Sequence, residues 1–319
     1  YVQELEQKAE QGDESAQFAL GSWYAEGRYV KPDYKLAIKW LEKAGKQGSD
    51  FSYFILGYHY NYGENFPLSR QKALEWYRKA AELGDSSTQE ILGDAYMYGD
   101  GFPQNTQLAL EWYRRAAAQG LAEAQDAIGV MFMQGEGVSQ DYQQALAWYR
   151  KAARQGLPAA QTHLGIMSAF GRGVAQSDRQ AIAWYRKAAK QDFAKAQYQL
   201  GVAYSTGRGV PENSRNALKW YLKAAEQGFT PAQLALGEIY AHGRQGVPKD
   251  NKQAYIWYYM ASIYTEKSKD DCSALIAERN RLKGTLTPDQ LSETYAAFDL
   301  IRRKINQSKE AKKIARKKY

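Results

Sequence analysis

The sequence repeats itself every 36 residues, and this periodicity constrains the fold more than any other feature. One glycine returns at this spacing without a slip, and one tryptophan does so until its last step, which is 37 residues because Gln245 adds one residue to a turn. The glycines are Gly21, Gly57, Gly93, Gly129, Gly165, Gly201 and Gly237, and the tryptophans are Trp40, Trp76, Trp112, Trp148, Trp184, Trp220 and Trp257. A period of about 20 to 50 residues is typical of solenoids, whose units bury their apolar faces against their neighbours.

The spacing of apolar residues predicts two helices in each unit, here called helix A and helix B. In the central unit this spacing is i, i+3, i+4, i+7 for Ala124, Ala127, Ile128 and Met131, and i, i+3, i+4, i+7 for Ala145, Trp148, Tyr149 and Ala152. A second glycine series, Gly27, Gly63, Gly99, Gly135, Gly171, Gly207 and Gly243, follows helix A and offers it a left-handed exit. Glycines such as Gly48 close helix B, and Asp13, Asp50 and Asp85 stand where an N-cap of the next helix A is expected.

Small residues at fixed places predict close packing between helices. Alanine pairs such as Ala152-Ala153 and the helix-A glycine let backbones approach closely, and the recurrent tryptophan is expected to fill the gap between repeats. A ring of this size buries on the order of 150–250 Å², so these residues are expected to be scaffold and not binding site.

The pattern A-x-x-x-L-G-x-x-Y-x-x-G-x-G-V-x-x-D-x-x-x-A-x-x-W-x-x-K-A-A-x-x-G resembles the Sel1-like repeat, a relative of the tetratricopeptide repeat, over about residues 13–265. The resemblance implies an all-α, right-handed superhelix with helix A on its concave face, and an adaptor role that is common in bacteria. Five residues depart from the pattern. Tyr29 and Asn65 replace the second turn glycine, Ser168 the helix-A tyrosine, Asp192 the closing glycine and Met260 the basic residue before the alanine pair.

We therefore predict one continuous body of seven repeats, with bounds 13–48, 49–84, 85–120, 121–156, 157–192, 193–228 and 229–265. Residues 1–12 match the second helix of a preceding unit. A cleaved signal peptide or a truncated start would each account for the missing methionine, which favours the bacterial periplasm or export, with the cytoplasm as the alternative. Residues 266–300 are expected to form capping helices, with Thr287 as an N-cap before Pro288.

The net charge of +8 belongs to the tail 301–319, which carries nine Lys or Arg and one acid, Glu310. The rest of the chain holds 34 basic and 34 acidic residues. Residues 302–319 could bind nucleic acid or an anionic membrane, could fold back on an acidic surface of the body, or could be a solvated end.

The sequence contains no recognisable catalytic motif. The three histidines, His59, His163 and His242, fall at different places in the repeat, and none has a second ligand three or four residues away. The single cysteine, Cys272, excludes an intrachain disulfide framework. The chain is predicted to be non-enzymatic, with no cofactor and no metal.

The candidate binding residues vary from unit to unit on helix A. Counted from the helix-A glycine, positions −3, +1, +4 and +5 are expected to face the concave groove, by resemblance to the tetratricopeptide arrangement. None of these 28 positions is Lys or Arg, although about one residue in seven of the chain is basic. The predicted contacts are Phe54, Tyr58, Asn61, Tyr62, Glu90, Asp94, Met97, Tyr98, Asp126 and Met133.

A groove lined by aromatics, Met and acids suits a partly apolar, basic protein partner, such as a peptide, a helix or a toxin domain. The alternative for Phe18, Phe54 and Phe170 is packing against helix A of the next unit. The predicted function is a protein-interaction scaffold, either an adaptor or host-interaction factor, or an immunity protein that masks a secreted toxin. The alternative function is nucleic-acid or membrane binding through residues 302–319.

Overall fold

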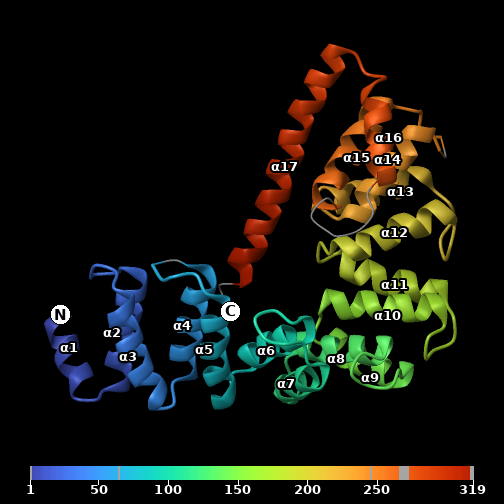
Figure 1. The fold of residues 1–319 in the computed structure, drawn as a ribbon. Coiled ribbons are helices and arrows are strands. Elements are labelled where there is room, and N and C mark those ends of the chain that lie inside the picture. The colour runs from blue at the N-terminus through green and yellow to red at the C-terminus, as the bar shows by residue number, and fades with distance from the viewer. Residues whose placement is uncertain (1, 64, 245, 266–272, 317–319) are drawn as a thin grey trace. The chain divides into compact units, whose positions relative to one another are not determined.

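The computed structural model describes residues 2–63, 65–244, 246–265 and 273–316, without the side chains of residues 264, 265, 309 and 311–316. All regular secondary structure in these ranges is helical (Figure 1). The helices are α1 (Val2–Glu10), α2 (Glu14–Glu26), α3 (Tyr34–Lys46), α4 (Asp50–Tyr62), α5 (Arg70–Leu83), α6 (Ser86–Tyr98), α7 (Thr106–Ala118), α8 (Ala122–Gln134), α9 (Tyr142–Arg154), α10 (Pro158–Phe170), α11 (Asp178–Ala189), α12 (Ala194–Thr206), α13 (Ser214–Ala225), α14 (Thr230–His242), α15 (Asn251–Thr265), α16 (Ser273–Lys283) and α17 (Pro288–Arg316).

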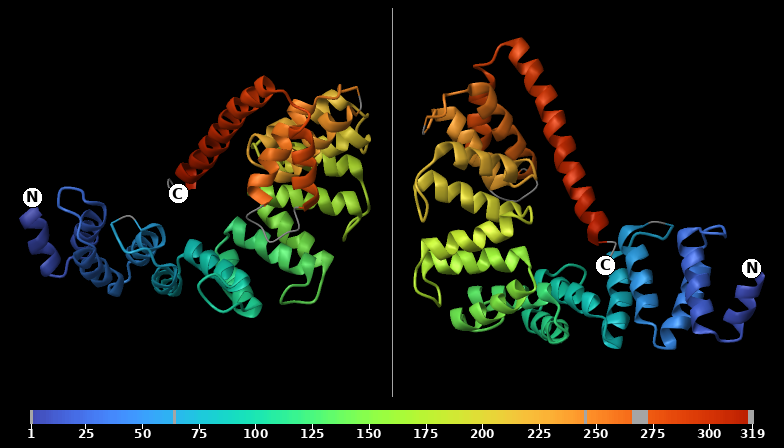
Figure 2. Two further views of the ribbon diagram at one scale, coloured as in Figure 1. Left: turned by 45° about the horizontal axis from the view of Figure 1, so that its top comes forward. Right: turned by 180° about the vertical axis from the view of Figure 1, so that it is seen from behind.

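The helices form two compact units, Tyr1–Gln155 and Gly156–Tyr319. In the first unit, helices A are α2, α4, α6 and α8, helices B are α3, α5, α7 and α9, and each helix packs on the next along the chain (Figure 2). In the second unit, α10 to α15 stack in the same way, and both α16 and α17 pack on α15. The prediction of an all-α repeat fold is confirmed.

Side-chain caps start most of these helices. Asp13 Oδ1 accepts from the backbone N–H of Ala16 and Asp85 Oδ1 from that of Thr88, as predicted. Asp50 does not cap α4: Ser49 holds the N-cap position, and Asp50 is the first helical residue. Helix B has a cap that we did not predict, an Asp, Asn or Ser at one place in every repeat from the first to the sixth, at Asp33, Ser69, Asn105, Asp141, Ser177 and Asn213.

Three of the departures from the repeat pattern take the backbone conformation of the glycine that they replace. Tyr29, Asn65 and Asp192 have φ of 60°, 60° and 59°, and they are the non-glycine residues with positive φ in the described ranges. A side chain in this left-handed region is strained, so the fold imposes the turn on these residues. Asp192 also forms side-chain hydrogen bonds at this place, since its Oδ1 accepts from Gln197 and Gln227.

The contact that joins helix A to helix B is a tyrosine ring lying on the helix-A glycine. A Cβ on Gly129 would lie 2.6 Å from the ring of Tyr149. The same contact recurs between Gly57, Gly93, Gly165, Gly201 and Gly237 and, respectively, Tyr77, Tyr113, Tyr185, Tyr221 and Tyr258. In the first repeat Leu41 takes this place against Gly21. These tyrosines are at most 7% exposed.

The tryptophan does not lie in this contact between the two helices of one repeat. It precedes the tyrosine by one residue and is rotated by about 100° around the helix. Trp76, Trp148, Trp184 and Trp220 are half-buried, whereas Trp40, Trp112 and Trp257 are buried. A basic residue three positions later covers the ring in the first six repeats, as Lys151 does at 4.0 Å from the Trp148 centroid.

Glutamines tie five of the repeats, in both units, to the helix that precedes them. Gln119 Nε2 donates to the backbone oxygen of Gly84 (2.8 Å) and to Oε1 of Gln89 (3.0 Å). The pairs Gln17–Gln47, Gln125–Gln155, Gln161–Gln191 and Gln197–Gln227 repeat the side-chain bond. The second repeat has Tyr53 and Leu83 at the two positions, so both members of the pair are replaced together.

The tyrosine–glycine contact leads to a stability prediction for Gly129→Ala. Alanine would ordinarily favour a helix interior by about 1 kcal/mol. Here the new methyl group meets a buried ring that has no room to move, and overpacking of this kind costs about 1–3 kcal/mol. We expect a lower midpoint in urea denaturation followed by circular dichroism, and no loss for the control Gly284→Ala, whose Cβ would meet only backbone oxygens at 3.5 Å and beyond. An unchanged midpoint for Gly129→Ala would contradict the contact.

The buried tyrosines predict a loss of stability at alkaline pH. Burial raises the pKa of Tyr221 and of Tyr258 to about 12, and raises the pKa of Tyr185 further. The unfolded chain loses these protons near pH 10 while the folded chain keeps them. The free energy of unfolding should therefore fall as pH rises through 10, by about 1.4 kcal/mol per pH unit for each such tyrosine.

Urea titrations at pH 8 to 11.5 measure this slope. Tyr185→Phe should reduce the slope by the contribution of one buried tyrosine, about 1.4 kcal/mol per pH unit. Tyr29→Phe, at a residue that is 77% exposed, should leave the slope unchanged. Equal slopes for the two variants would show that burial of Tyr185 does not hold its proton.

Candidate functional site

The four predicted rows of helix A differ in exposure. The +5 row is exposed along both units, with Tyr62 at 47%, Tyr98 at 73% and Phe170 at 59%. The +4 row mostly faces the core, and Met97 is only 5% exposed. The reason is helical geometry, because a residue four positions after the glycine lies on the glycine's own face, which points at helix B. Asn61 and Met133, in the same row, are half-buried.

Five aromatic side chains follow one another across α2 and α4, and we call them the aromatic ladder: Phe18, Phe51, Phe54, Tyr58 and Tyr62. Their successive ring centroids lie 5.8, 5.7, 6.5 and 4.6 Å apart. Phe51 was not predicted, because it precedes the −3 row by one helical turn, and it is 55% exposed. Phe18 contacts Phe51 on helix A of the next repeat, which is the packing that we weighed as an alternative for Phe18, whereas Phe54 lies 5.8 Å from Tyr77 on helix B of its own repeat.

A second group of predicted residues surrounds the hydroxyl of Tyr113. This hydroxyl donates a hydrogen bond of 2.6 Å to Oδ1 of Asp94, and the charges of Asp94 and Glu90 both add to the rise in the pKa of Tyr113 that its burial causes. Burial raises the pKa of Asp94 as well, and the Tyr113 hydroxyl and the Arg70 guanidinium act against that rise. Tyr98, with a pKa raised by its own partial burial and by Asp94, belongs to the same group.

Asp126 lies apart from this group. It is 9% exposed and its charge acts on Tyr149, the tyrosine of its own repeat, where it adds to the rise in the Tyr149 pKa that burial causes. The side chain is thus largely enclosed, and it presents little carboxylate to a partner.

Arg70 is a residue of this surface that our reasoning missed. It begins α5, so it lies outside the helix-A rows, yet its Nη1 donates to Oδ1 of Asn61 (2.9 Å) and its Nε to Oδ2 of Asp100 (2.9 Å). The same two places in the repeat carry Asp178 and Arg208, which pair at 3.0 Å with the charges exchanged. Opposite charges 30 residues apart in both cases were the signal in the sequence.

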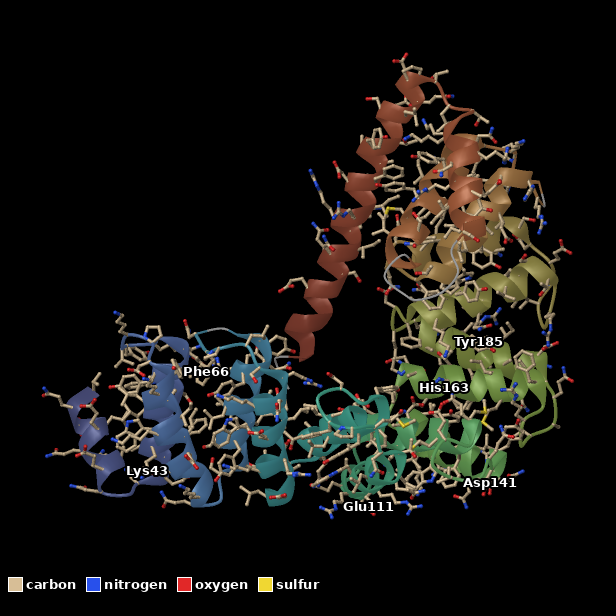
Figure 3. The ribbon with its side chains drawn as sticks, viewed as in Figure 1. Lys43, Phe66, Glu111, Asp141, His163 and Tyr185 are labelled. Carbon is tan, nitrogen blue, oxygen red and sulfur yellow. The ribbon has the colours of Figure 1, made fainter. Side chains whose placement is uncertain are left out.

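The remaining chemistry candidates are the three histidines and the cysteine. Within the described residues no three His, Cys, Asp or Glu side chains come together as metal ligands would. His59 is buried and stacks at 5.0 Å on Phe66 in the first unit, and His163 lies in α10 of the second (Figure 3). Cys272 lies outside the described residues. No described helix combines the length and apolar character that a bilayer crossing requires.

The predicted cap and tail are continuous in the second unit. The expected N-cap is present, since Thr287 Oγ1 accepts from the backbone N–H of Gln290. α17 then runs from the cap into the basic segment without a break as far as Arg316. Within it Ile305 is fully buried, and Lys304 Nζ forms a 2.6 Å ion pair with Glu226.

These features define an all-α helical-repeat protein whose variable side chains lie on helix A. The model of the Sel1 repeat matches residues 14–49, 51–85, 86–121, 122–157, 158–193, 194–229 and 230–262. The chain therefore belongs to the Sel1 repeat family, whose members generally mediate protein–protein interactions.

One solved structure also shows the family, and two others are similar to this chain. A Sel1 repeat protein from Oxalobacter formigenes is 34% identical, with a TM-score of 0.73, and the match covers 89% of this chain and 80% of that one. A protective antigen of uropathogenic Escherichia coli is 26% identical (TM-score 0.49, covering 95% and 87%). An immunity protein from Pseudomonas aeruginosa is 24% identical (TM-score 0.48, covering 62% and 75%). A search of curated proteins found no match.

The hydrogen bond between Tyr113 and Asp94 leads to a prediction for Tyr113→Phe. Loss of the donor leaves a half-buried carboxylate with one partner fewer, which should cost about 1–3 kcal/mol at pH 7. The raised pKa of Asp94 means that the folded state binds more protons than the unfolded state just above the usual carboxyl pKa. The free energy of unfolding therefore falls as the pH rises above the usual carboxyl pKa, because Asp94 loses its proton. Without the Tyr113 hydroxyl, which acts against the rise in the Asp94 pKa, the variant should lose more stability over the same pH range.

Urea denaturation at pH 3.5 and pH 7 tests this. The deficit of Tyr113→Phe should be larger at pH 7, whereas Tyr185→Phe, which lacks a hydrogen-bonded carboxylate among the described contacts, should show a deficit independent of pH in this range. A deficit of Tyr113→Phe that is the same at both pH values would contradict the assignment.

Proposed function

We propose that this protein is a non-catalytic scaffold that binds a partner protein on the helix-A face of its first unit. The central contacts are Tyr58, Tyr62, Glu90, Asp94 and Tyr98, with Asp126 at the margin because of its burial. Phe54, Asn61 and Met133 are half-buried and contribute edges, and Met97 supports the surface from the core.

One observation carries this proposal, namely that large aromatics are exposed on helix A beside carboxylates. Tyr98 is 73% exposed, and Glu90 and Asp94 lie on the same helix within electrostatic range of Tyr113. Tyrosine is enriched among the anchors of protein interfaces. The acidic side chains favour a partner segment with basic residues, because complementary charge speeds and orients association.

Two biological settings are consistent with this proposal. A bacterial adaptor would hold two or more proteins together, and an immunity protein would mask the active surface of one secreted toxin. The genes next to this one distinguish the settings, since an immunity protein is encoded beside its toxin.

Affinity capture from the native organism tests the proposal, with two double variants compared with the parent chain. Glu90→Lys with Tyr98→Ala removes a charge and a ring from the proposed surface. Glu75→Lys with Phe170→Ala makes the same chemical changes at exposed positions elsewhere. The first variant should recover at least about tenfold less partner, as expected for loss of a hot spot, and both should keep the parent melting temperature. Equal recovery by the first variant and the parent would refute the proposed surface.

A further inference from the structure

The second unit shows which kind of element the helix-A surface accepts. α17 lies against the last two repeats, where Ile301 borders two apolar clusters: one that Tyr198 and Phe229 also border, and one that Leu234 also borders. Ile305 is fully buried, and its Cγ2 lies 3.1 Å from the position of a Cβ on Gly228. Tyr198 and Leu234 are the −3 residues of the sixth and seventh repeats, so the amphipathic helix α17 borders the same two clusters as this row.

The first two repeats carry apolar side chains at the equivalent places. Five repeats of 36 residues separate Phe18 from Tyr198, Phe54 from Leu234 and Gly48 from Gly228. Elsewhere in the −3 row at least one residue of each neighbouring pair is Glu, Asp or Thr. A Cβ on Gly48 would meet no atom within 4 Å, in contrast to Gly228. The place that Ile305 fills in the second unit is therefore open in the first.

One charge differs between the two surfaces. α17 is fixed by the ion pair of Lys304 with Glu226, and the residue at the place of Glu226 in the first repeat is Lys46. Lys46 is exposed and lies 3.4 Å from Glu42, which also lies 3.8 Å from Lys79, so two cations share one carboxylate. A helix with lysine at the anchoring position would be repelled there, and a helix with a carboxylate would be attracted.

We infer that the aromatic ladder, together with Gly48 and Lys46, is a docking site for an amphipathic α-helix of a partner protein. The helix places an aliphatic residue on Gly48, further apolar residues on Phe18, Phe51 and Phe54, and an Asp or Glu beside Lys46. The charge at Lys46 also excludes the α17 helix of a second copy of this chain. This inference rests on the proposed function, since it specifies the partner segment at one end of the proposed surface.

Two peptides that differ by one charge test the site on the full chain. The first has the sequence of residues 288–308, and the second is the same peptide with K304E. By fluorescence anisotropy the second should bind the parent chain about three- to tenfold more tightly, the range expected for exchanging repulsion for attraction at an interface rim. Lys46→Glu should reverse this preference.

Phe51→Ala should weaken binding of the K304E peptide by at least about tenfold, as for an interface anchor, whereas Phe170→Ala should not change it. The inference would be overturned if neither peptide bound, or if Lys46→Glu did not alter the preference for the K304E peptide. Tighter binding of the first peptide would also overturn it, and would indicate a second copy of this chain as the occupant. The capture experiment uses Glu90 and Tyr98 and leaves Phe51 and Lys46 intact. Failure of the helix site and failure of the proposed function are therefore separate results.

Discussion

The contact between a tyrosine ring on helix B and a glycine on helix A determines the geometry of the structure. The ring occupies the volume that a side chain on the glycine would fill, so the glycine lets the two helices of a repeat approach closely, and in the first repeat Leu41 takes the place of the ring. Because the contact recurs at one spacing, each repeat presents helix A in the same orientation. The glutamine pairs add a polar connection between successive repeats, and they use backbone oxygens that would otherwise be left at the ends of helices. Variation of side chains on the outer turns of helix A then changes the surface without changing the scaffold.

The departures from the repeat pattern have local explanations. Tyr29, Asn65 and Asp192 keep the left-handed turn of the glycines that they replace, so the fold tolerates strain at these places. Met260 takes the position at which other repeats carry a lysine or arginine over tryptophan. It is fully buried, because the capping helices cover the seventh repeat and exclude water from that position. The last repeat is thus adapted to its cap, as expected for the end of a helical array.

The helix-A face differs from place to place in a way that has consequences for binding. At its beginning it carries the aromatic ladder, and further along Glu90 and Asp94 surround the hydroxyl of Tyr113. In the last two repeats α17, which the chain itself provides, packs against clusters that this face also borders. An internal helix that already occupies one part of a repeated surface indicates the shape and polarity that the unoccupied parts accept, with the local charge deciding which helix fits.

The sequence by itself determined the all-α repeat fold, the positions of its turns and the family, because a fixed period of glycine, alanine and tryptophan leaves few other ways to bury the apolar residues. It also located the rows of helix A that vary. Only the tertiary structure decided that tyrosine, and not tryptophan, lies on the helix-A glycine, because the two are adjacent and have the same period. It likewise placed Met97 in the core, enclosed Asp126, brought Arg70 to Asn61, and set α17 on the last repeats. These outcomes depend on contacts between residues distant in the sequence, which periodicity alone does not specify.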